Sequence, residues 1–491
     1  MIKHFVKLSI LLTLLIGCAS PTTKAIPEEN SVFYEIFVAS FYDSDGDGRG
    51  DLQGVIEKLD YVQHDLGATG IWLMPIHPSR SYHKYDVMDY KDIDPAYGTM
   101  ADMEALIKEM EDRNMDLIID LVINHSSNEH PWFLEAVEEF KNDACIKYCD
   151  YYTLSKTAEP GYHLKYKDLY YAGNFADTMP ELNLSNPEVK KEIFDIVKFW
   201  VDKGVSGFRL DATTHYFEDN SEQNINFIKE FSDYAYSLDP DLYIVGEAWK
   251  NSSIILPMYA SNISFFNFDV AQNKGQLVRS INNQKGHSLA NYIMNYNEQI
   301  RAYNPNGKDA IFFSNHDQGR SASYFANQIE KQKLAASTYL LMPGNVFIYY
   351  GEEIGMIGSG RDENKRLAMP WGEAKGMTLD PQNSDYEKEL EMDVKSEQAN
   401  KDSLFNHYQK VINTRHTFPS ISREQGISVK LDDEALFAMQ FDDIIVVHNF
   451  SSERLTITGD YHIEDNSLGG KARNGSIELD GYQTVILSKS K

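Results

Sequence analysis

Short apolar runs alternate with amphipathic helical patterns along most of this chain of 491 residues. Runs of this length predict buried strands, and the segment from Val189 to Trp200 has the spacing of an amphipathic helix, with Asn186-Pro187 at its start and Gly204 at its end. We predict eight strands, at 32–37, 70–75, 116–123, 205–210, 242–246, 265–268, 310–314 and 345–350. Eight strand-helix repeats favour a closed (β/α)8 TIM barrel over an open sheet, so chemistry is expected at the carboxyl ends of the strands.

Two regions depart from this alternation. The connection 126–185, 60 residues rich in tyrosine and polar side chains, is too long for a plain loop and predicts an inserted domain after the third strand. After residue 417 the pattern changes to short alternating runs with Gly and Asn turns, which predicts a C-terminal antiparallel β domain at 418–491. The barrel, with its insert, is therefore expected to span 31–417.

The composition excludes several classes of protein. Lysine and arginine number 46 against 74 acidic residues, a net charge of −28, and such a field repels phosphate backbones, so no nucleic-acid partner is expected. A mean hydropathy of −0.44 excludes a polytopic membrane protein. The 30 tyrosines suit a surface that is apolar on one side and hydrogen-bonding on the other, as a sugar ligand requires.

The N-terminus has the pattern of an export signal. Lys3 and Lys7 precede an apolar run that is too short to span a bilayer, so 1–17 is expected to be a signal peptide. The run ends in Leu-Ile-Gly-Cys, which resembles a bacterial lipobox, and Cys18 would then carry the lipid. Residues 18–30 would be a tether, and the protein would be exported and lipid-anchored to a bacterial membrane or cell surface. The alternative is an ordinary secreted protein with a chance cysteine.

The other two cysteines, Cys145 and Cys149, are four residues apart. Outside the cytoplasm a disulfide between them would persist, and two free thiols are the alternative. A zinc site is not expected because the chain has no second cysteine pair.

Four predicted strands end in polar clusters, at 120–125, 207–211, 246–249 and 315–317. Arg209 and Asp211 are two residues apart, so they point the same way, and we expect the guanidinium to lower the pKa of Asp211 and keep it ionised as a nucleophile. Glu247 follows the next strand, and acids on neighbouring strand ends reach the separation of about 5 Å that retaining glycoside hydrolysis needs. Asp317 would stabilise an oxocarbenium-like transition state.

A second motif is the acidic loop 43–51, with carboxylates at alternate positions. Asp43, Asp45, Asp47 and Asp51 could converge on a hard cation, with Gly48 allowing the sharp turn. The loop begins like an EF-hand, but Gly54 stands where an EF-hand has its bidentate glutamate, so that interpretation fails.

With these motifs in order, the chain resembles glycoside hydrolase family 13, the α-amylase family, over nearly its whole length. The resemblance implies a catalytic barrel, an inserted B domain and a C-terminal β domain. It makes Asp211 the nucleophile, Glu247 the general acid/base and Asp317 the transition-state stabiliser. It also implies that the acidic loop binds Ca²⁺ through its four aspartates and the backbone carbonyl of Arg49.

The same resemblance identifies substrate-binding residues at the subsite where the bond is cleaved. These candidates are Tyr82, Tyr85, His125, Arg209, His316, Asp362 and Arg366. Many members bind a second calcium ion through an Asn at the position of Asn124. In many α-amylases a Lys precedes the position of His215, and here Thr214 stands in its place. This difference weakens the prediction of a second calcium site.

Members of the family cleave or rebuild α-1,4 or α-1,6 bonds. Ala212 follows the nucleophile, where members that prefer α-1,6 bonds often have Val, so we expect an α-amylase acting on α-1,4 bonds of starch-like glucans and maltooligosaccharides. We also expect the protein to be a monomer. One alternative is an α-glucosidase, oligo-1,6-glucosidase or transglycosylase acting on short oligosaccharides. Another is a non-catalytic carbohydrate-binding protein, which the presence of all three acids disfavours.

Overall fold

The computed structural model describes residues 32–218, 220–326, 328–386 and 392–489. The predicted signal peptide at 1–17, the lipidation site Cys18 and the tether at 18–30 lie outside this part of the chain. Within it, no helix is both long enough and apolar enough to span a bilayer.

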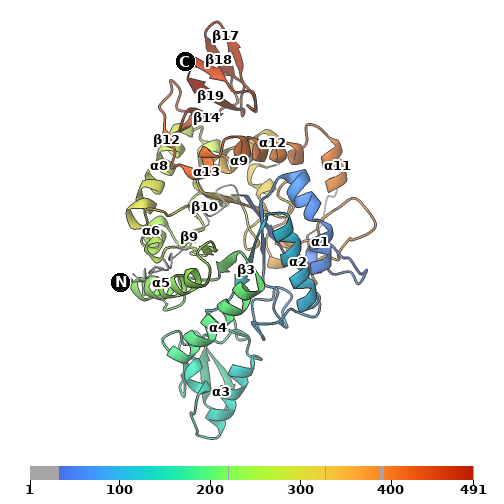
Figure 1. Ribbon diagram of the computed structural model, residues 1–491, viewed down its shortest axis with the longest axis vertical. Coiled ribbons are helices and arrows are strands. Elements are labelled where there is room, and N and C mark those ends of the chain that lie inside the picture. The colour runs from blue at the N-terminus through green and yellow to red at the C-terminus, as the bar shows by residue number, and fades with distance from the viewer. Residues whose placement is uncertain (1–31, 219, 327, 387–391, 490–491) are drawn as a thin grey trace, which may run out of the picture.

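Eight parallel strands form the central barrel (Figure 1). They are β1 (Val32–Ile36), β2 (Gly70–Leu73), β3 (Asp116–Leu121), β7 (Gly207–Leu210), β8 (Tyr243–Gly246), β9 (Ser264–Phe265), β10 (Ala310–Phe312) and β11 (Asn345–Tyr349). Their spatial order is β10-β11-β1-β2-β3-β7-β8-β9, and a parallel bridge between Phe266 and Ala310 joins the two edge strands. The predicted TIM barrel is therefore confirmed.

Helices surround the barrel and continue its alternation. They are α1 (Leu52–Glu57), α2 (Met100–Asp112), α4 (Pro187–Lys203), α5 (Ser221–Leu238), α6 (Ser252–Met258), α7 (Gln276–Asn282), α8 (Gly286–Tyr303), α9 (Ile329–Leu340), α10 (Asp362–Lys365), α11 (Val394–Ala399), α12 (Leu404–Thr417) and α13 (Ser420–Arg423). α4 begins and ends as its sequence predicts: Asn186 accepts the Glu188 N–H, Pro187 occupies the first turn, and Gly204 ends the helix with φ 100°. The apolar pattern between Leu52 and Leu66 forms two pieces, α1 and a π-helical turn, η2 (Tyr61–Leu66).

Strand alternation separates two apolar layers. Phe33, Trp72 and Phe347 belong to a cluster inside the barrel, whereas Tyr34 and Ile36 belong to the larger cluster between strands and helices. Because successive side chains of a strand point to opposite faces, Glu35 lies on the same inner face as Phe33.

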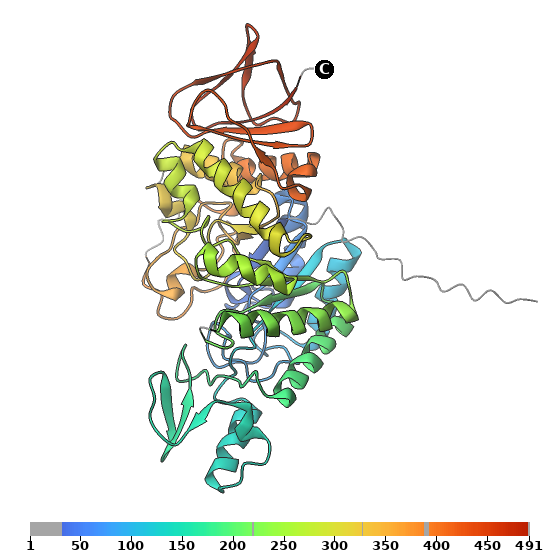
Figure 2. The same ribbon diagram turned by 90° about the vertical axis from the view of Figure 1, so that its left-hand side faces the viewer.

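The insert between β3 and α4 is a small unit that extends away from the barrel (Figure 2). It contains α3 (Pro131–Lys141), a 3-10 helix η3 (Tyr148–Tyr151), and a sheet of β4 (Leu154–Ser155), β6 (Leu169–Ala172) and β5 (Tyr162–Tyr166). A bridge between His125 and Glu181 ties it to the end of β3, and a bridge between Tyr152 and Leu182 joins two of its own segments.

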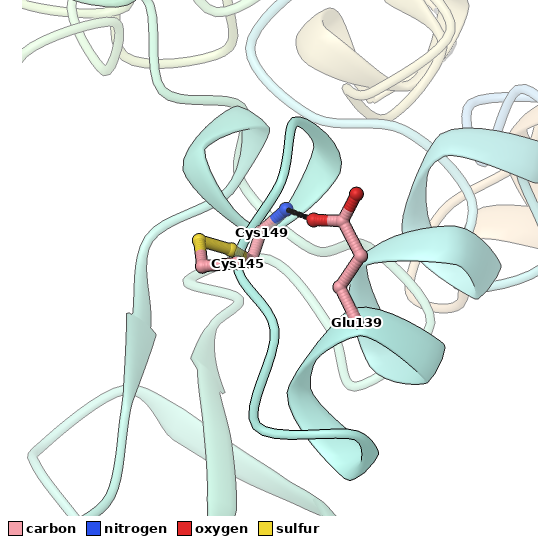
Figure 3. Close-up of side chains that lie close together, drawn as sticks. All are labelled: Glu139, Cys145 and Cys149. Atoms are coloured by element: carbon pink, nitrogen blue, oxygen red, sulfur yellow. Dashed lines mark hydrogen bonds between the residues drawn. A yellow bond between two sulfur atoms is a disulfide. The ribbon is translucent and has the colours of Figure 1, made fainter.

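A disulfide joins Cys145 and Cys149, whose Cα atoms are 5.6 Å apart. Beside it, the Glu139 carboxylate on α3 accepts the backbone N–H groups of Ile146, Lys147 and Cys149, the last at 2.9 Å (Figure 3). Of the two alternatives for these cysteines, the structure has the disulfide, and it holds a short loop against α3.

The C-terminal region forms two antiparallel sheets, as its alternating pattern predicts. One sheet has the order β12-β13-β14-β19-β16, and the other has the order β15-β18-β17. The strands are β12 (Ile427–Ser428), β13 (Leu436–Phe441), β14 (Ile444–Asn449), β15 (Leu455–Thr458), β16 (Tyr461–Ile463), β17 (Lys471–Arg473), β18 (Ser476–Leu479) and β19 (Thr484–Lys489).

Candidate active site

A cavity of about 420 Å³ lies where the polar clusters at the strand ends meet. Seven of the predicted site residues line it: Tyr85, His125, Asp211, Glu247, Asp317, Asp362 and Arg366. Three more do not line it. Arg209 and His316 are buried and contact residues that line it, and Tyr82 lines a neighbouring pocket and binds Arg366, which lines this one.

Arg209 on β7 is the centre of the charged groups. Its Nη1 donates to Asp211 Oδ1 at 2.7 Å and to both oxygens of Asp120, at 2.9 and 3.0 Å. Its Nη2 donates to Glu247 Oε2 at 2.7 Å. One guanidinium therefore holds the carboxylates that follow β7 and β8 beside each other. The spacing of Arg209 and Asp211 predicts the first of these contacts.

The chain makes a tight turn directly after Asp211. Ala212 has φ 49°, a left-handed conformation that costs energy for a residue with a Cβ atom. In this conformation its backbone N–H donates to Glu247 Oε2 at 3.2 Å, and its side chain faces the cavity. The turn thus adds a second donor to the carboxylate that Arg209 already binds.

The pKa of Asp211 is raised, not lowered as we expect from its arginine neighbour. Burial is the larger effect and outweighs the charge of Arg209. For Glu247, burial first and the charge of Asp211 also raise the pKa, to about 7, against the opposing effect of Arg209. The expectation for Asp211 was wrong because sequence spacing reveals its partner but not the water it loses.

Asp317, which follows β10, lies between two cations. Arg366 Nη2 donates to its Oδ1 at 2.9 Å, and His316 Nε2 lies 3.1 Å from its Oδ2. Although burial acts to raise the pKa of Asp317, His316 and Arg366 hold it well below its ordinary value. Lys365 Nζ also donates to the Asp317 carbonyl at 2.8 Å, so the backbone is held as well.

The two tyrosines predicted to contact the sugar have different environments. Tyr85 lines the cavity, and its ring stacks on His316 with centroids 5.6 Å apart. The Tyr82 hydroxyl instead accepts from Arg366 Nη1 at 3.0 Å, and its ring packs edge-on against Phe37. The geometry favours Tyr85 as the residue that a ligand in the cavity would touch.

Asp362 and Arg366 both line the cavity but have separate partners. Asp362 accepts from Lys365 at 2.7 Å, whereas Arg366 binds Asp317 and Tyr82. The guanidinium of Arg366 therefore belongs to the charged group around Asp317.

Several residues of the site were not predicted from the sequence. Glu35 on β1 lies beneath His316, and Asp120 on β3 beneath Arg209. His83, Phe175 and Trp249 line the cavity. Trp249 is 45% exposed and stacks on Phe268. The sequence did contain a signal for Glu35, which stands inside the apolar strand Val-Phe-Tyr-Glu-Ile. A strand of this kind is expected to be buried, and a buried acid is costly unless it has a partner.

The acidic loop gathers three of its four predicted aspartates. Asp43, Asp45 and Asp51 each place a carboxylate oxygen within 4.8 Å of the others. The Asp47 Oδ1 instead accepts the Arg49 N–H at 2.7 Å. Asp51 also caps α1 by accepting the Gly54 N–H at 2.7 Å. Three oxygens at this spacing fit a cation of calcium size, with its oxygen ligands at about 2.4 Å.

Asn124 does not line the cavity but a neighbouring pocket of about 240 Å³, which Glu181, His215 and Glu218 also line. Burial raises the pKa of Glu181 there. The pocket separates the insert from the loop after β7.

Fold and site together define a glycoside hydrolase on a TIM barrel, and known proteins identify the family. The α-amylase catalytic-domain family model matches residues 35–424. Alpha-amylase 3 of Dictyoglomus thermophilum is 39% identical, and the alignment covers 99% of each chain. Amy13B of Eubacterium rectale, a solved structure, is 38% identical, with a TM-score of 0.90 over 95% of this chain and 97% of that one. The chain belongs to the α-amylase family of glycoside hydrolases.

The family includes relatives with other bond preferences. A glucan 1,6-alpha-glucosidase of Streptococcus pneumoniae is 30% identical, over 93% of this chain and 96% of its own. An oligo-1,6-glucosidase of Bacillus cereus is 29% identical, over 87% and 91%. Relatives whose names specify 1,6-linked substrates thus also match most of the chain, at lower identity than alpha-amylase 3.

Proposed function

We propose that this protein is an α-amylase, a retaining enzyme that cleaves α-1,4-glucosidic bonds in starch-like glucans and maltooligosaccharides. The observation that carries the proposal is the single guanidinium of Arg209, bound to both Asp211 and Glu247 at 2.7 Å. It holds two carboxylates side by side at one end of the barrel, the arrangement that a double displacement needs.

In this proposal Asp211 attacks the anomeric carbon and Glu247 protonates the departing oxygen. With its pKa raised to about 7, Glu247 is protonated in mildly acidic solution and has a proton to give. Asp317 remains ionised and faces the positive charge that develops on the sugar ring. In the second step, Glu247 takes a proton from a water molecule while the water oxygen attacks the anomeric carbon. This attack breaks the bond between the sugar and Asp211 and gives net retention.

Two observations favour α-1,4 bonds. Ala212, which lines the cavity, has a small side chain at the position where α-1,6-preferring members often have Val. Alpha-amylase 3 is also 39% identical, against 30% for the glucan 1,6-alpha-glucosidase. The alternative is an oligo-1,6-glucosidase or transglycosylase that acts on short substrates. Its support is the similarity to the glucan 1,6-alpha-glucosidase and the oligo-1,6-glucosidase, at 30% and 29% identity.

A product profile from amylose, maltotriose, pullulan and isomaltose tests the proposal. We expect amylose to be cleaved into α-configured maltooligosaccharides, with isomaltose left intact. Consumption of isomaltose and short oligosaccharides alone would identify the oligo-1,6-glucosidase alternative. Release of β-configured products would overturn the retaining mechanism. If none of the four is hydrolysed, the proposed activity is overturned and the alternative of a non-catalytic carbohydrate-binding protein is favoured.

We also propose that the acidic loop binds one Ca²⁺ and that the ion stabilises the fold. Asp43, Asp45 and Asp51 supply carboxylate oxygens at a suitable spacing, and the Arg49 carbonyl would complete the set. The loop leads into α1, so a bound ion would hold the connection between β1 and this helix. Its role would be structural.

Chelation tests the calcium proposal. An ion at about a hundred times its Kd stabilises by about 2.7 kcal/mol, so removal with a chelator should lower the thermal midpoint by several degrees. Asp45→Asn should bind less calcium by elemental analysis, whereas Asp89→Asn, an exposed acid elsewhere, should not. An unchanged midpoint and metal content after chelation would contradict the proposal.

Finally, we propose that the mature protein is lipidated at Cys18 and held at a bacterial membrane or cell surface. The support is the charged, apolar and Leu-Ile-Gly-Cys pattern of the first 18 residues. In a bacterial host the wild-type protein should sediment with membranes and incorporate labelled fatty acid, and Cys18→Ser should do neither. Equal sedimentation of the two forms would refute the anchor.

A further inference from the structure

Glu35 is a carboxylate inside the barrel. It lies on the inner face of β1, one layer above Phe33, and is only 1% exposed. Its neighbours in register are Trp72 on β2 and Tyr349 on β11. An ionised group in such a place requires a charged partner, because water cannot reach it.

That partner is His316. Glu35 Oε1 lies 2.5 Å from His316 Nδ1, across 281 residues of sequence. The other ring nitrogen, Nε2, lies 3.1 Å from Asp317 Oδ2 and 2.7 Å from the Tyr85 hydroxyl. The imidazole thus spans the distance between a buried carboxylate and one that lines the cavity.

The contacts around the ring indicate which nitrogens have protons. The Tyr85 hydroxyl donates to Asp120 at 3.1 Å, so toward His316 it acts as an acceptor. Nε2 therefore faces two acceptors, and Nδ1 faces a carboxylate. Both nitrogens have to donate, which makes His316 an imidazolium.

Other charged groups act on His316 from each element around it. They are Asp120 on β3, Asp211 and Glu247 after β7 and β8, and Arg366, whose Nε donates to the His316 carbonyl at 3.2 Å. Arg209 on β7 acts on Glu35. Trp72 closes the ring's edge with centroids 5.7 Å apart. Burial alone would lower the pKa of His316, but Asp317 and Glu35 raise it to about 9.

We propose that Glu35 is a positioning residue for glycoside hydrolysis, which keeps His316 doubly protonated and aims its Nε2–H at Asp317. With a neutral partner in place of Glu35, His316 would lose its second proton at a lower pH. The neutral ring would no longer present a positive charge to the Asp317 carboxylate. Asp317 would then lose part of the attraction that holds it in the position in which it faces the sugar.

Glu35→Gln tests the proposal because glutamine keeps the shape and an acceptor oxygen but removes the charge. By NMR, with His316→Gln to assign the signal, the His316 ring should titrate at least about one pH unit lower in the variant. The ratio of wild-type to variant kcat/KM should be below about threefold near pH 6 and rise by about tenfold or more toward pH 9, one pKa unit corresponding to a factor of ten. Glu35→Asp keeps the charge and should restore much of the alkaline activity.

Glu353→Gln is the matched control. It is also a fully buried carboxylate, but it binds Tyr34 and Tyr61 on the outer side of β1. It should leave the His316 titration and the pH profile unchanged. An unchanged His316 titration in Glu35→Gln, or an equal loss of activity at every pH, would overturn the inference.

The inference rests on the proposed hydrolytic function, but the NMR titration requires no activity. If no substrate is cleaved by the wild-type enzyme, the function fails while the titration still decides the role of Glu35. If Glu35→Gln does not fold, the same titration of His316 is carried out on Glu35→Asp, with Glu353→Gln as the control. Aspartate is one methylene shorter, so its carboxylate lies farther from Nδ1, and the pKa of His316 should fall in Glu35→Asp but not in Glu353→Gln.

Discussion

At the scale of single residues, one arginine and one histidine organise five buried or half-buried acids. Arg209 binds Asp120, Asp211 and Glu247, and His316 lies between Glu35 and Asp317. With Glu247 at a pKa of about 7 and Asp317 held well below its ordinary value, two acids of similar chemistry have different protonation states at the same pH. In the proposed mechanism, this difference lets Glu247 act as an acid and Asp317 as an anion.

Glu247→Gln tests the acid role. The proton of Glu247 is present below its pKa of about 7, so wild-type kcat/KM should fall as pH rises through that value. The variant should lose about 10²- to 10⁴-fold in kcat on maltooligosaccharides and lack this alkaline limb. On a substrate with an activated aryl leaving group, which departs without a proton, the loss in the first step should be much smaller.

Asp309→Asn serves as the control for Glu247→Gln, since Asp309 is equally buried and its pKa is also raised to about 7, but it binds Asn267 and Tyr259. Its kcat and pH profile should match the wild type. An alkaline limb that survives in Glu247→Gln would assign that limb to another group.

At the scale of secondary-structure elements, a buried glutamate joins three parts of the barrel wall. Glu352, just after β11, accepts from Ser314 after β10, from Tyr339 on α9 at 2.7 Å and from Tyr408 on α12 at 3.1 Å. Burial raises its pKa from 4.5 to about 7, and its hydrogen bonds only partly oppose this. The folded protein therefore keeps a proton here that the unfolded chain releases.

This proton makes stability depend on pH. Because the folded pKa is above the unfolded one, the contribution of Glu352 is fully present below about pH 4.5 and is lost as pH rises through about 7. The loss amounts to at most about 3 kcal/mol. Denaturant unfolding of Glu352→Gln should show a smaller fall in the free energy of unfolding between these pH values than the wild type shows. Parallel curves for the two proteins would mean that Glu352 has the same pKa in the folded and the unfolded protein.

The elements themselves follow closely from local sequence. The eight strands lie where apolar runs predict them, and Asn186-Pro187 and Gly204 mark the ends of α4. The differences occur where packing outweighs pattern. β9 is only Ser264–Phe265, because the chain then turns to bridge Ala310, and the single periodic stretch 52–66 divides into α1 and η2.

At the scale of the whole molecule, the chain has a net charge of −28. Three acids are proposed for catalysis and a few for calcium, so most of the acidic excess has no assigned role. A field of this sign repels anions and has no effect on the approach of a neutral sugar.

A salt titration separates these two cases. On neutral maltooligosaccharides, kcat/KM should change by less than about twofold between roughly 20 and roughly 500 mM salt, where charges more than about 10 Å apart become screened. On carboxymethylated oligosaccharides of the same length it should increase with salt. A strong salt dependence with the neutral substrate would show that surface charge acts on the site itself.

The sequence by itself determined the barrel, the C-terminal sheets and which strand ends have polar groups. Period-two and helical patterns are local properties, and parallel strands bring their carboxyl ends together wherever a barrel closes. For the same reason Asp211, Glu247 and Asp317 could be placed at one cavity without coordinates.

Only the tertiary structure decided how those groups are charged and supported. Glu35 and His316 are 281 residues apart, and no local pattern relates them. The raised pKa of Asp211 depends on burial, and the choice between Tyr82 and Tyr85 depends on which ring the loop turns toward the cavity. Desolvation and contacts between distant segments are properties of the folded molecule, because both depend on which atoms exclude water from a group.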